Sequence, residues 1–151
     1  WLGASLYAAH QGMTAIYAPP PIDLDAEAQT GKLLTRMISS GTVTAAHDIS
    51  DGGLAVAIAE MAMKSGLGAS IMAPESGQIH AWAFGEDQAR FVVSTADGTA
   101  LIAAAKDAGI EITKIGIVSE TSELQFGDRD TISVAEINEV FESCIPSLMA
   151  G

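Results

Sequence analysis

Residues 47–54 decide the fold, and they read His47-Asp48-Ile49-Ser50-Asp51-Gly52-Gly53-Leu54. Residues 43–46, just before them, are small or β-branched and predict a short buried strand. Apolar residues recur from Leu54 to Met63, which predicts a helix that opens at Gly52-Gly53 and is stopped by Gly66 and Gly68. Two carboxylates and two glycines therefore lie between a strand and a helix, where sheets of this kind bind ligands.

Helices and strands alternate along the rest of the chain. A helix is expected to follow Asp25 and to stop near Gly41, because apolar residues recur every three or four positions from Leu33 to Ile38. Further predictions are a stiff proline-rich connector at 17–23, strands at 68–72, 90–95 and 110–118, a helix at 99–108, a hairpin at 125–134 and a helix at 135–148, capped by Ser133 and limited by Pro146. This order predicts an α/β fold, with a mixed sheet and helices packed on it.

Composition limits the classes of function. A chain of 151 residues with 48% hydrophobic content is expected to form one compact domain. Its 19 acidic and 7 basic side chains give a net charge of −12, which argues against nucleic-acid and membrane partners. No apolar run reaches the roughly 20 residues that cross a bilayer. The single cysteine, Cys144, predicts a small buried residue in a reducing cytoplasm.

Two interpretations of residues 47–54 stay open. In the first, Ser50, Asp51, Gly52 and Gly53 bind a nucleotide or substrate, and Asp48 holds the Mg²⁺ that accompanies a phosphate group. In the second, Ser50 or Asp51 caps the helix, the glycines form a tight turn and His47 is a satisfied core histidine.

A second polar cluster reads Phe84-Gly85-Glu86-Asp87-Gln88-Ala89-Arg90. The acid of Glu86, the amide of Gln88 and the guanidinium of Arg90 can together bind a polar ligand. Alternatively, Gly85 ends a short helix and Glu86 pairs with Arg90 in a surface ion pair worth under about 1 kcal/mol. The sequence carries no zinc-like spacing, nucleophile elbow or phosphate-binding glycine motif, so no catalytic residue is predicted.

Both clusters resemble motifs of the PurL family, the synthetase subunits of phosphoribosylformylglycinamidine synthase. The first, continued by Ala59-Glu60-Met61-Ala62, is similar to the pattern HDxSDGGLxxxLAEMA, and the second to FGExxxR. The segment Leu2-Gly3-Ala4-Ser5-Leu6-Tyr7 also resembles a family segment, LGGSEY, but has alanine at position 4 and leucine at position 6.

The resemblance implies a fold, an activity and partners. The fold is that of the C-terminal domain of the aminoimidazole-ribonucleotide (AIR) synthetase superfamily, with residues 1–151 as a single domain of a longer chain. The implied activity is an ATP- and Mg²⁺-dependent C–N ligation in purine biosynthesis, for which this piece alone is inactive. Implied partners are the rest of the chain, the glutaminase PurQ and the small subunit PurS. The alternative is a structural module that docks those partners.

Overall fold

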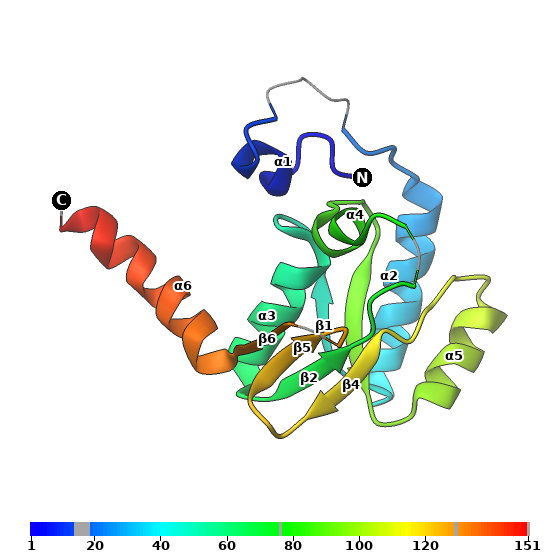
Figure 1. The fold of residues 1–151 in the computed structure, drawn as a ribbon. Coiled ribbons are helices and arrows are strands. Elements are labelled where there is room, and N and C mark those ends of the chain that lie inside the picture. The colour runs from blue at the N-terminus through cyan, green and yellow to red at the C-terminus, as the bar shows by residue number, and fades with distance from the viewer. Residues whose placement is uncertain (14–18, 76, 129, 151) are drawn as a thin grey trace. The chain divides into compact units, whose positions relative to one another are not determined.

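The computed structural model describes residues 1–13, 19–75, 77–128 and 130–150 (Figure 1). The chain divides into two compact units, Trp1–Ile58 with Ser76–Lys114 and Ala59–Glu75 with Ile115–Gly151. Of the predicted proline-rich connector, residues 17 and 18 lie outside the described residues, and residues 19–23 form neither helix nor strand.

The first unit contains an antiparallel strand pair and several helices. The strands are β1 (Val43–Asp48) and β3 (Phe91–Thr95), with Ala46 opposite Val93 and Asp48 opposite Phe91. The helices are α1 (Leu6–His10), α2 (Leu24–Ser39), α4 (Ile79–Phe84), α5 (Gly98–Asp107) and the first part of α3 (Gly53–Ser65). The predicted strand–helix order around residues 47–54 is confirmed.

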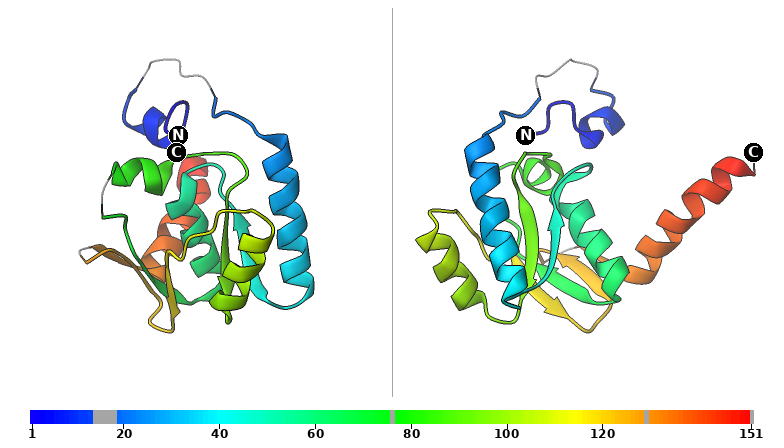
Figure 2. Two further views of the ribbon diagram at one scale, coloured as in Figure 1. Left: turned by 90° about the vertical axis from the view of Figure 1, so that its right-hand side faces the viewer. Right: turned by 180° about the vertical axis from the view of Figure 1, so that it is seen from behind.

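A small apolar core holds this unit together. Its buried members come from α2, β1 and α5, and they are Leu33, Met37, Val43, Leu101 and Ala105. Helices α2 and α5 lie side by side in every view (Figures 1 and 2). The predicted amphipathic helix after residue 25 is thus confirmed, although it begins two residues earlier, at Leu24. Asp23 caps it by accepting hydrogen bonds from the Asp25 and Ala26 amides at 3.1 and 3.0 Å.

The strand predicted at 43–46 is longer and less buried than expected. It runs to Asp48, and only Val43 is fully buried, while residues 44–46 are exposed. Side-chain burial depends on what covers the faces of a strand, and Val43 is the residue of β1 that belongs to the buried apolar core.

The second unit is built on a mixed four-stranded sheet. Its strands β2 (Gly68–Ile71), β4 (Gly116–Ser119), β5 (Glu123–Phe126) and β6 (Asp130–Ser133) lie in the order β4-β2-β5-β6. The β2–β5 pair is parallel, and the β2–β4 and β5–β6 pairs are antiparallel. A mixed sheet and a late hairpin were both predicted, and both are confirmed.

The strand predicted at 110–118 is wrong over most of its length. Only residues 116–119 pair in the sheet, whereas residues 110–115 form no strand. Ile110 and Ile112 pack against the core of the first unit instead. Their alternation therefore reflects the anchoring of a connection, which produces the same apolar spacing as a strand.

The final helix, α6 (Val134–Met149), matches the predicted helix to within one residue at each end and corrects one expectation, the burial of Cys144. Ser133 caps it as predicted, since its hydroxyl accepts from the Glu136 amide at 3.1 Å. Pro146 does not end the helix, because the Ala150 amide still bonds to the Pro146 carbonyl at 3.0 Å. Cys144 is exposed and not buried, as are all residues of α6 from 139 to 149. No helix among the described residues has the length and apolar character needed to cross a membrane.

Candidate functional site

Strand pairing brings the two predicted polar clusters together. The first cluster joins β1 to α3, and the second joins α4 to β3. Because Asp48 lies opposite Phe91, the loop after β1 and the segment before β3 meet at one end of the strand pair. The Ile49 amide donates to the Arg90 carbonyl at 2.9 Å, which extends the pairing beyond the strands.

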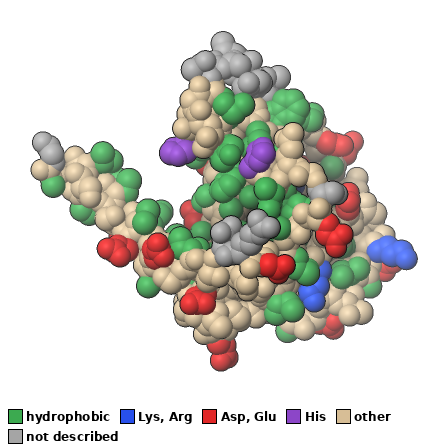
Figure 3. Space-filling view, in the orientation of Figure 1, with side chains coloured by type: hydrophobic (Ala, Val, Ile, Leu, Met, Phe, Trp, Pro, Cys, Tyr) green, Lys and Arg blue, Asp and Glu red, His purple; other side chains and the backbone are tan. Residues whose placement is uncertain are grey.

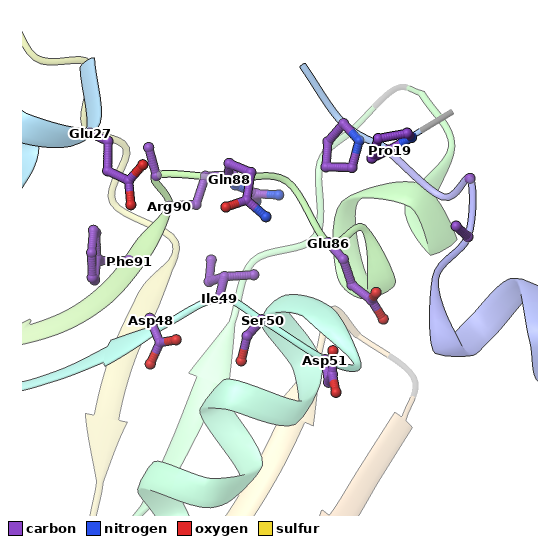
Figure 4. A pocket seen from close by; sticks show the side chains of 14 residues that line it. Pro19, Glu27, Asp48, Ile49, Ser50, Asp51, Glu86, Gln88, Arg90 and Phe91 are labelled. Atoms are coloured by element: carbon purple, nitrogen blue, oxygen red, sulfur yellow. The ribbon is translucent and has the colours of Figure 1, made fainter. Parts of the chain in front are cut away.

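A cavity of about 350 Å³ lies where these segments meet (Figure 4). Gln88 and Arg90 stand on one side of it, and Asp48, Ser50 and Asp51 come from the loop opposite. Six of the eight predicted site residues line the cavity, namely Asp48, Ser50, Asp51, Glu86, Gln88 and Arg90. The structure therefore gathers the polar residues that the two motifs contain into one place.

Gly52 and Gly53 do not line the cavity, and their contribution is to packing. Both have positive φ, +82° and +72°, which L side chains rarely adopt. A Cβ on Gly53 would lie 2.6 Å from the Phe84 carbonyl carbon and 2.9 Å from the Gly85 oxygen. The start of α3 thus passes the end of α4 at a distance that only glycine permits.

Glu86 does not pair with Arg90, contrary to the alternative expected from the sequence. Its Oε1 accepts hydrogen bonds from the backbone amides of Leu6 and Gly52, each at 2.9 Å. No side-chain capping bond from Ser50 or Asp51 is present among the described residues, and the Gly52 amide ahead of α3 donates to the Glu86 carboxylate instead.

Arg90 instead pairs with Asp87. Its Nη1 lies 2.8 Å from Asp87 Oδ2, and the backbone nitrogen of Trp1 lies 2.8 Å from Asp87 Oδ1. Burial opposes ionisation of this carboxyl, yet the hydrogen bond from the Trp1 nitrogen and the Arg90 guanidinium hold the pKa of Asp87 below its ordinary value. Asp87 thereby fixes the position of the one guanidinium at the cavity.

Asp48 presents an accessible carboxylate. Its side chain is 66% exposed, and the Nδ1 of His47 lies 3.6 Å from Asp48 Oδ1 and 2.7 Å from the Asp48 backbone oxygen. Within the described residues no group of three or more His, Cys, Asp or Glu side chains is placed to hold a metal. A single carboxylate fits Mg²⁺, which usually takes one or two protein carboxylates and fills its other positions with water and phosphate oxygens.

Several lining residues had no signal in the sequence. Glu27 reaches the cavity from α2, and Pro19 and Pro20 from the connector, because the fold returns these segments to the site. Ala4 and Ala89 also line it, both in the left-handed region with φ of 59° and 58°. Backbone strain of this kind collects at ligand sites. For Ala4 the signal was present, since the family pattern has glycine there.

The fold and cavity define a class of protein: a mixed α/β domain with an acidic, glycine-bordered pocket at a strand–helix junction. The chain belongs to the family described as AIR synthase related protein, C-terminal domain, whose model matches residues 2–129. This match confirms the fold and the superfamily that the motifs indicated.

Two curated relatives are similar over the whole chain. It is 43% identical to the phosphoribosylformylglycinamidine synthase subunit PurL of Methylocella silvestris over 153 residues, and 44% identical to that of Bradyrhizobium sp. (strain ORS 278) over 154 residues. Each alignment covers 100% of this chain and 21% of the relative. The chain thus spans about a fifth of the length of the curated relatives it matches.

Solved structures with a similar fold come from Thermotoga maritima. Its PurL complexed with FGAR superposes with a TM-score of 0.71 at 20% identity, over 84% of this chain and 23% of that one. Its PurL complexed with ATP gives 0.62 at 20% identity, over 72% and 21%. A PurLQS structure gives 0.66 at 21% identity, over 82% and 23%. At this identity the likeness supports the fold alone.

Proposed function

We propose that this chain forms one wall of a nucleotide or substrate cleft in a phosphoribosylformylglycinamidine synthase. That enzyme uses ATP and glutamine-derived ammonia to convert formylglycinamide ribonucleotide to its amidine. The observation that carries the proposal is the cavity of about 350 Å³ that unites both family motifs. The whole-chain similarity to PurL subunits supports it.

The proposed roles follow from accessibility and charge. Asp48 contributes one carboxylate oxygen to Mg²⁺, which neutralises phosphate charge when bound. Ser50, Gln88 and Arg90 offer hydrogen-bond donors to a polar ligand. The described side chains around the cavity include no nucleophile paired with a base. The chain is therefore proposed to bind rather than to catalyse, and to be inactive by itself.

Electrostatics make the proposed binding depend on the metal. Glu27, Asp48, Asp51 and Glu86 give the cavity four carboxylates against the single guanidinium of Arg90. A bare triphosphate would be repelled, whereas its Mg²⁺ complex brings the positive charge that the cavity lacks.

Partners and location belong to the same proposal. We propose that residues 1–151 act as one domain of a longer chain that works with the glutaminase PurQ and the small subunit PurS. The whole-chain similarity to curated PurL subunits supports this proposal, and the Thermotoga maritima structure described as PurLQS shares the fold. A cytoplasmic location is part of the proposal.

Calorimetric titration tests the proposed site. The chain is titrated with Mg-ATP, with ATP plus chelator, and with formylglycinamide ribonucleotide. Binding of Mg-ATP that chelator and Asp48→Ala each weaken by about tenfold or more supports the site, because loss of one charge-assisted contact costs about 1.5–3 kcal/mol. Asp107→Ala, at the exposed end of α5, is the control. Equal heats for both variants would count against an Asp48 metal site.

A structural module is the second candidate, because Glu86 and Gly53 make contacts within the fold. Replacing Asp48 and Asp51 in the full-length enzyme separates the two functions. Lost activity with normal folding supports a binding site. Unchanged activity leaves only the structural role.

A further inference from the structure

We propose that Glu86 is a positioning residue: one oxygen of its carboxylate clamps the start of α1 to the loop before α3. The clamp deepens the proposed function of the same cavity, but its geometry stands without that function. Glu86 Oε1 accepts from the Leu6 amide and from the Gly52 amide, each at 2.9 Å.

Both amides belong to groups that a helix cannot satisfy itself. Leu6 is the first residue of α1, and Gly52 directly precedes α3, so neither amide has a carbonyl acceptor one turn earlier in its own helix. A carboxylate is a strong acceptor for such amides, and these bonds are charge-assisted. One side chain therefore satisfies two helix starts that lie far apart in the sequence.

Neighbouring contacts hold together the N-terminal segment with α1, the end of α4 and the start of α3. The Glu86 amide donates to the Trp1 carbonyl at 3.0 Å, so residue 86 is bonded to the N-terminal segment through both its backbone and its side chain. The rings of Tyr7 and Phe84 stack with centroids 5.0 Å apart. Gly53 approaches the backbone of Phe84 more closely than any side chain allows. The clamp is thus the polar centre of a packed junction.

The junction borders the cavity on two sides. Gly3 and Ala4 line the cavity ahead of the Leu6 amide, and Ser50 and Asp51 line it ahead of the Gly52 amide. Loss of the Glu86 bonds would release both of these cavity-lining segments at once. In Figure 4 the Glu86 carboxylate points away from Gln88 and Arg90, toward the α1 side. Glu86 therefore acts on the cavity through the loops that it holds.

Positioning and ligand binding require different properties of this side chain. The clamp needs an acceptor oxygen at the right reach, which glutamine retains. Metal binding or charge recognition needs the negative charge, which glutamine loses. Glu86→Gln therefore separates the two roles, and Glu86→Ala removes both.

The experiment is residue-resolved amide hydrogen exchange by NMR on this 151-residue chain. We expect Glu86→Ala to speed hydrogen exchange at the Leu6 and Gly52 amides together by about tenfold or more. The reason is that both amides lose their acceptor and become accessible to water. Glu86→Gln keeps the acceptor oxygen but loses the charge, so it should speed exchange at both amides clearly less than Glu86→Ala does. Glu111→Ala, an exposed glutamate of the same unit, should leave both unchanged.

Two results would overturn the clamp. One is unchanged exchange at Leu6 and Gly52 in Glu86→Ala. The other is exchange at both amides in Glu86→Gln that is as fast as in Glu86→Ala, because an acceptor oxygen at this position would then make no difference. If Glu86→Ala does not fold, Glu86→Asp replaces it, since its shorter side chain cannot reach both amides. Mg-ATP titration of the parent chain is read separately: a failure there counts against the proposed function and leaves the exchange result standing.

Discussion

Ala4 and Ala89 hold left-handed backbone conformations at the rim of the cavity, with φ of 59° and 58°. An L residue in this region costs about 1–2 kcal/mol. Glycine avoids that cost but loses about 0.4–1 kcal/mol through its freer unfolded chain. At these positions the alanine side chain therefore works against the fold.

Ala4→Gly is expected to raise the free energy of unfolding by about 0.5–1 kcal/mol. Denaturant titration measures the change. Ala103→Gly, in the exposed middle of α5, is the matched control and should lower the same free energy by about 1 kcal/mol. A lower free energy of unfolding in both variants would show that the backbone of residue 4 is not left-handed in solution.

Gly53→Ala is expected to lower stability more than Gly109→Ala does. Both glycines have nearly equal positive φ, +72° and +70°, so both variants carry about 1 kcal/mol of backbone strain. Only at Gly53 does the new Cβ meet backbone atoms, which adds about 1–3 kcal/mol of overpacking. Denaturation midpoints compare the two. Equal losses would contradict the close approach of α3 and α4.

Asp87 makes a pH-dependent contribution to stability. Its folded pKa lies below 3.8, so the contribution is present above that pH and is lost as the pH falls through the folded pKa. Asp87→Asn should lower stability at pH 7 by under about 1 kcal/mol, because the pair with Arg90 is about one third exposed. Thermal melts should show the difference shrinking below about pH 3.8, whereas Asp107→Asn should show little difference at any pH. A difference that grows in acid would contradict this assignment.

At the scale of elements, sequence patterns predicted most of the regular structure. Helices α2, α5 and α6 have capping residues and apolar spacing that can be recognised from the nearby sequence. The hairpin turn at Gly127 is likewise set by nearby residues. The strand expected at 110–118 failed because alternating isoleucines also anchor connections. Helix α6 continues for three residues past Pro146 and ends within one residue of the predicted position.

Most residues of the candidate site could be picked out from the sequence, but their hydrogen-bond partners could not. The motif residues on either side of the β1–β3 pair were predicted as two separate polar clusters, and the structure places six of the predicted site residues around one cavity. The bonds of Glu86 join it to residues 80 and 34 positions away. Local sequence patterns carry no information on contacts at such sequence separations. The alternative expected from the sequence therefore paired Glu86 with its near neighbour Arg90.

Helix α6 exposes its thiol, so Cys144 should react quickly in the folded chain. We expect its rate with an uncharged thiol reagent to lie within about tenfold of the rate in denaturant, because exposure governs access. The control is Ala105→Cys in a Cys144→Ser background, since residue 105 is 0% exposed and its thiol should react only on unfolding. Strong protection of Cys144 would mean that α6 is covered in solution.

At the scale of the whole molecule, charge is the dominant property. The chain carries a net charge of −12, and acidic side chains are spread over the face seen in Figure 3, where basic ones are sparse. Such an excess of one sign destabilises a compact state through self-repulsion. The same excess makes a divalent cation a natural part of any phosphate complex at the cavity.

Salt should therefore stabilise this chain. Raising NaCl from about 0.01 to 1 M shortens the screening length from about 30 to 3 Å and weakens the repulsion. If about 1 kcal/mol of repulsion is relieved, Tm should rise by about 2–4 °C for a chain of this size. The rise should vanish near pH 4.3, the isoelectric point of the sequence, where no net charge remains to be screened. A fall in Tm with salt at pH 7 would mean that attractive ion pairs, such as Asp87 with Arg90, outweigh the net repulsion.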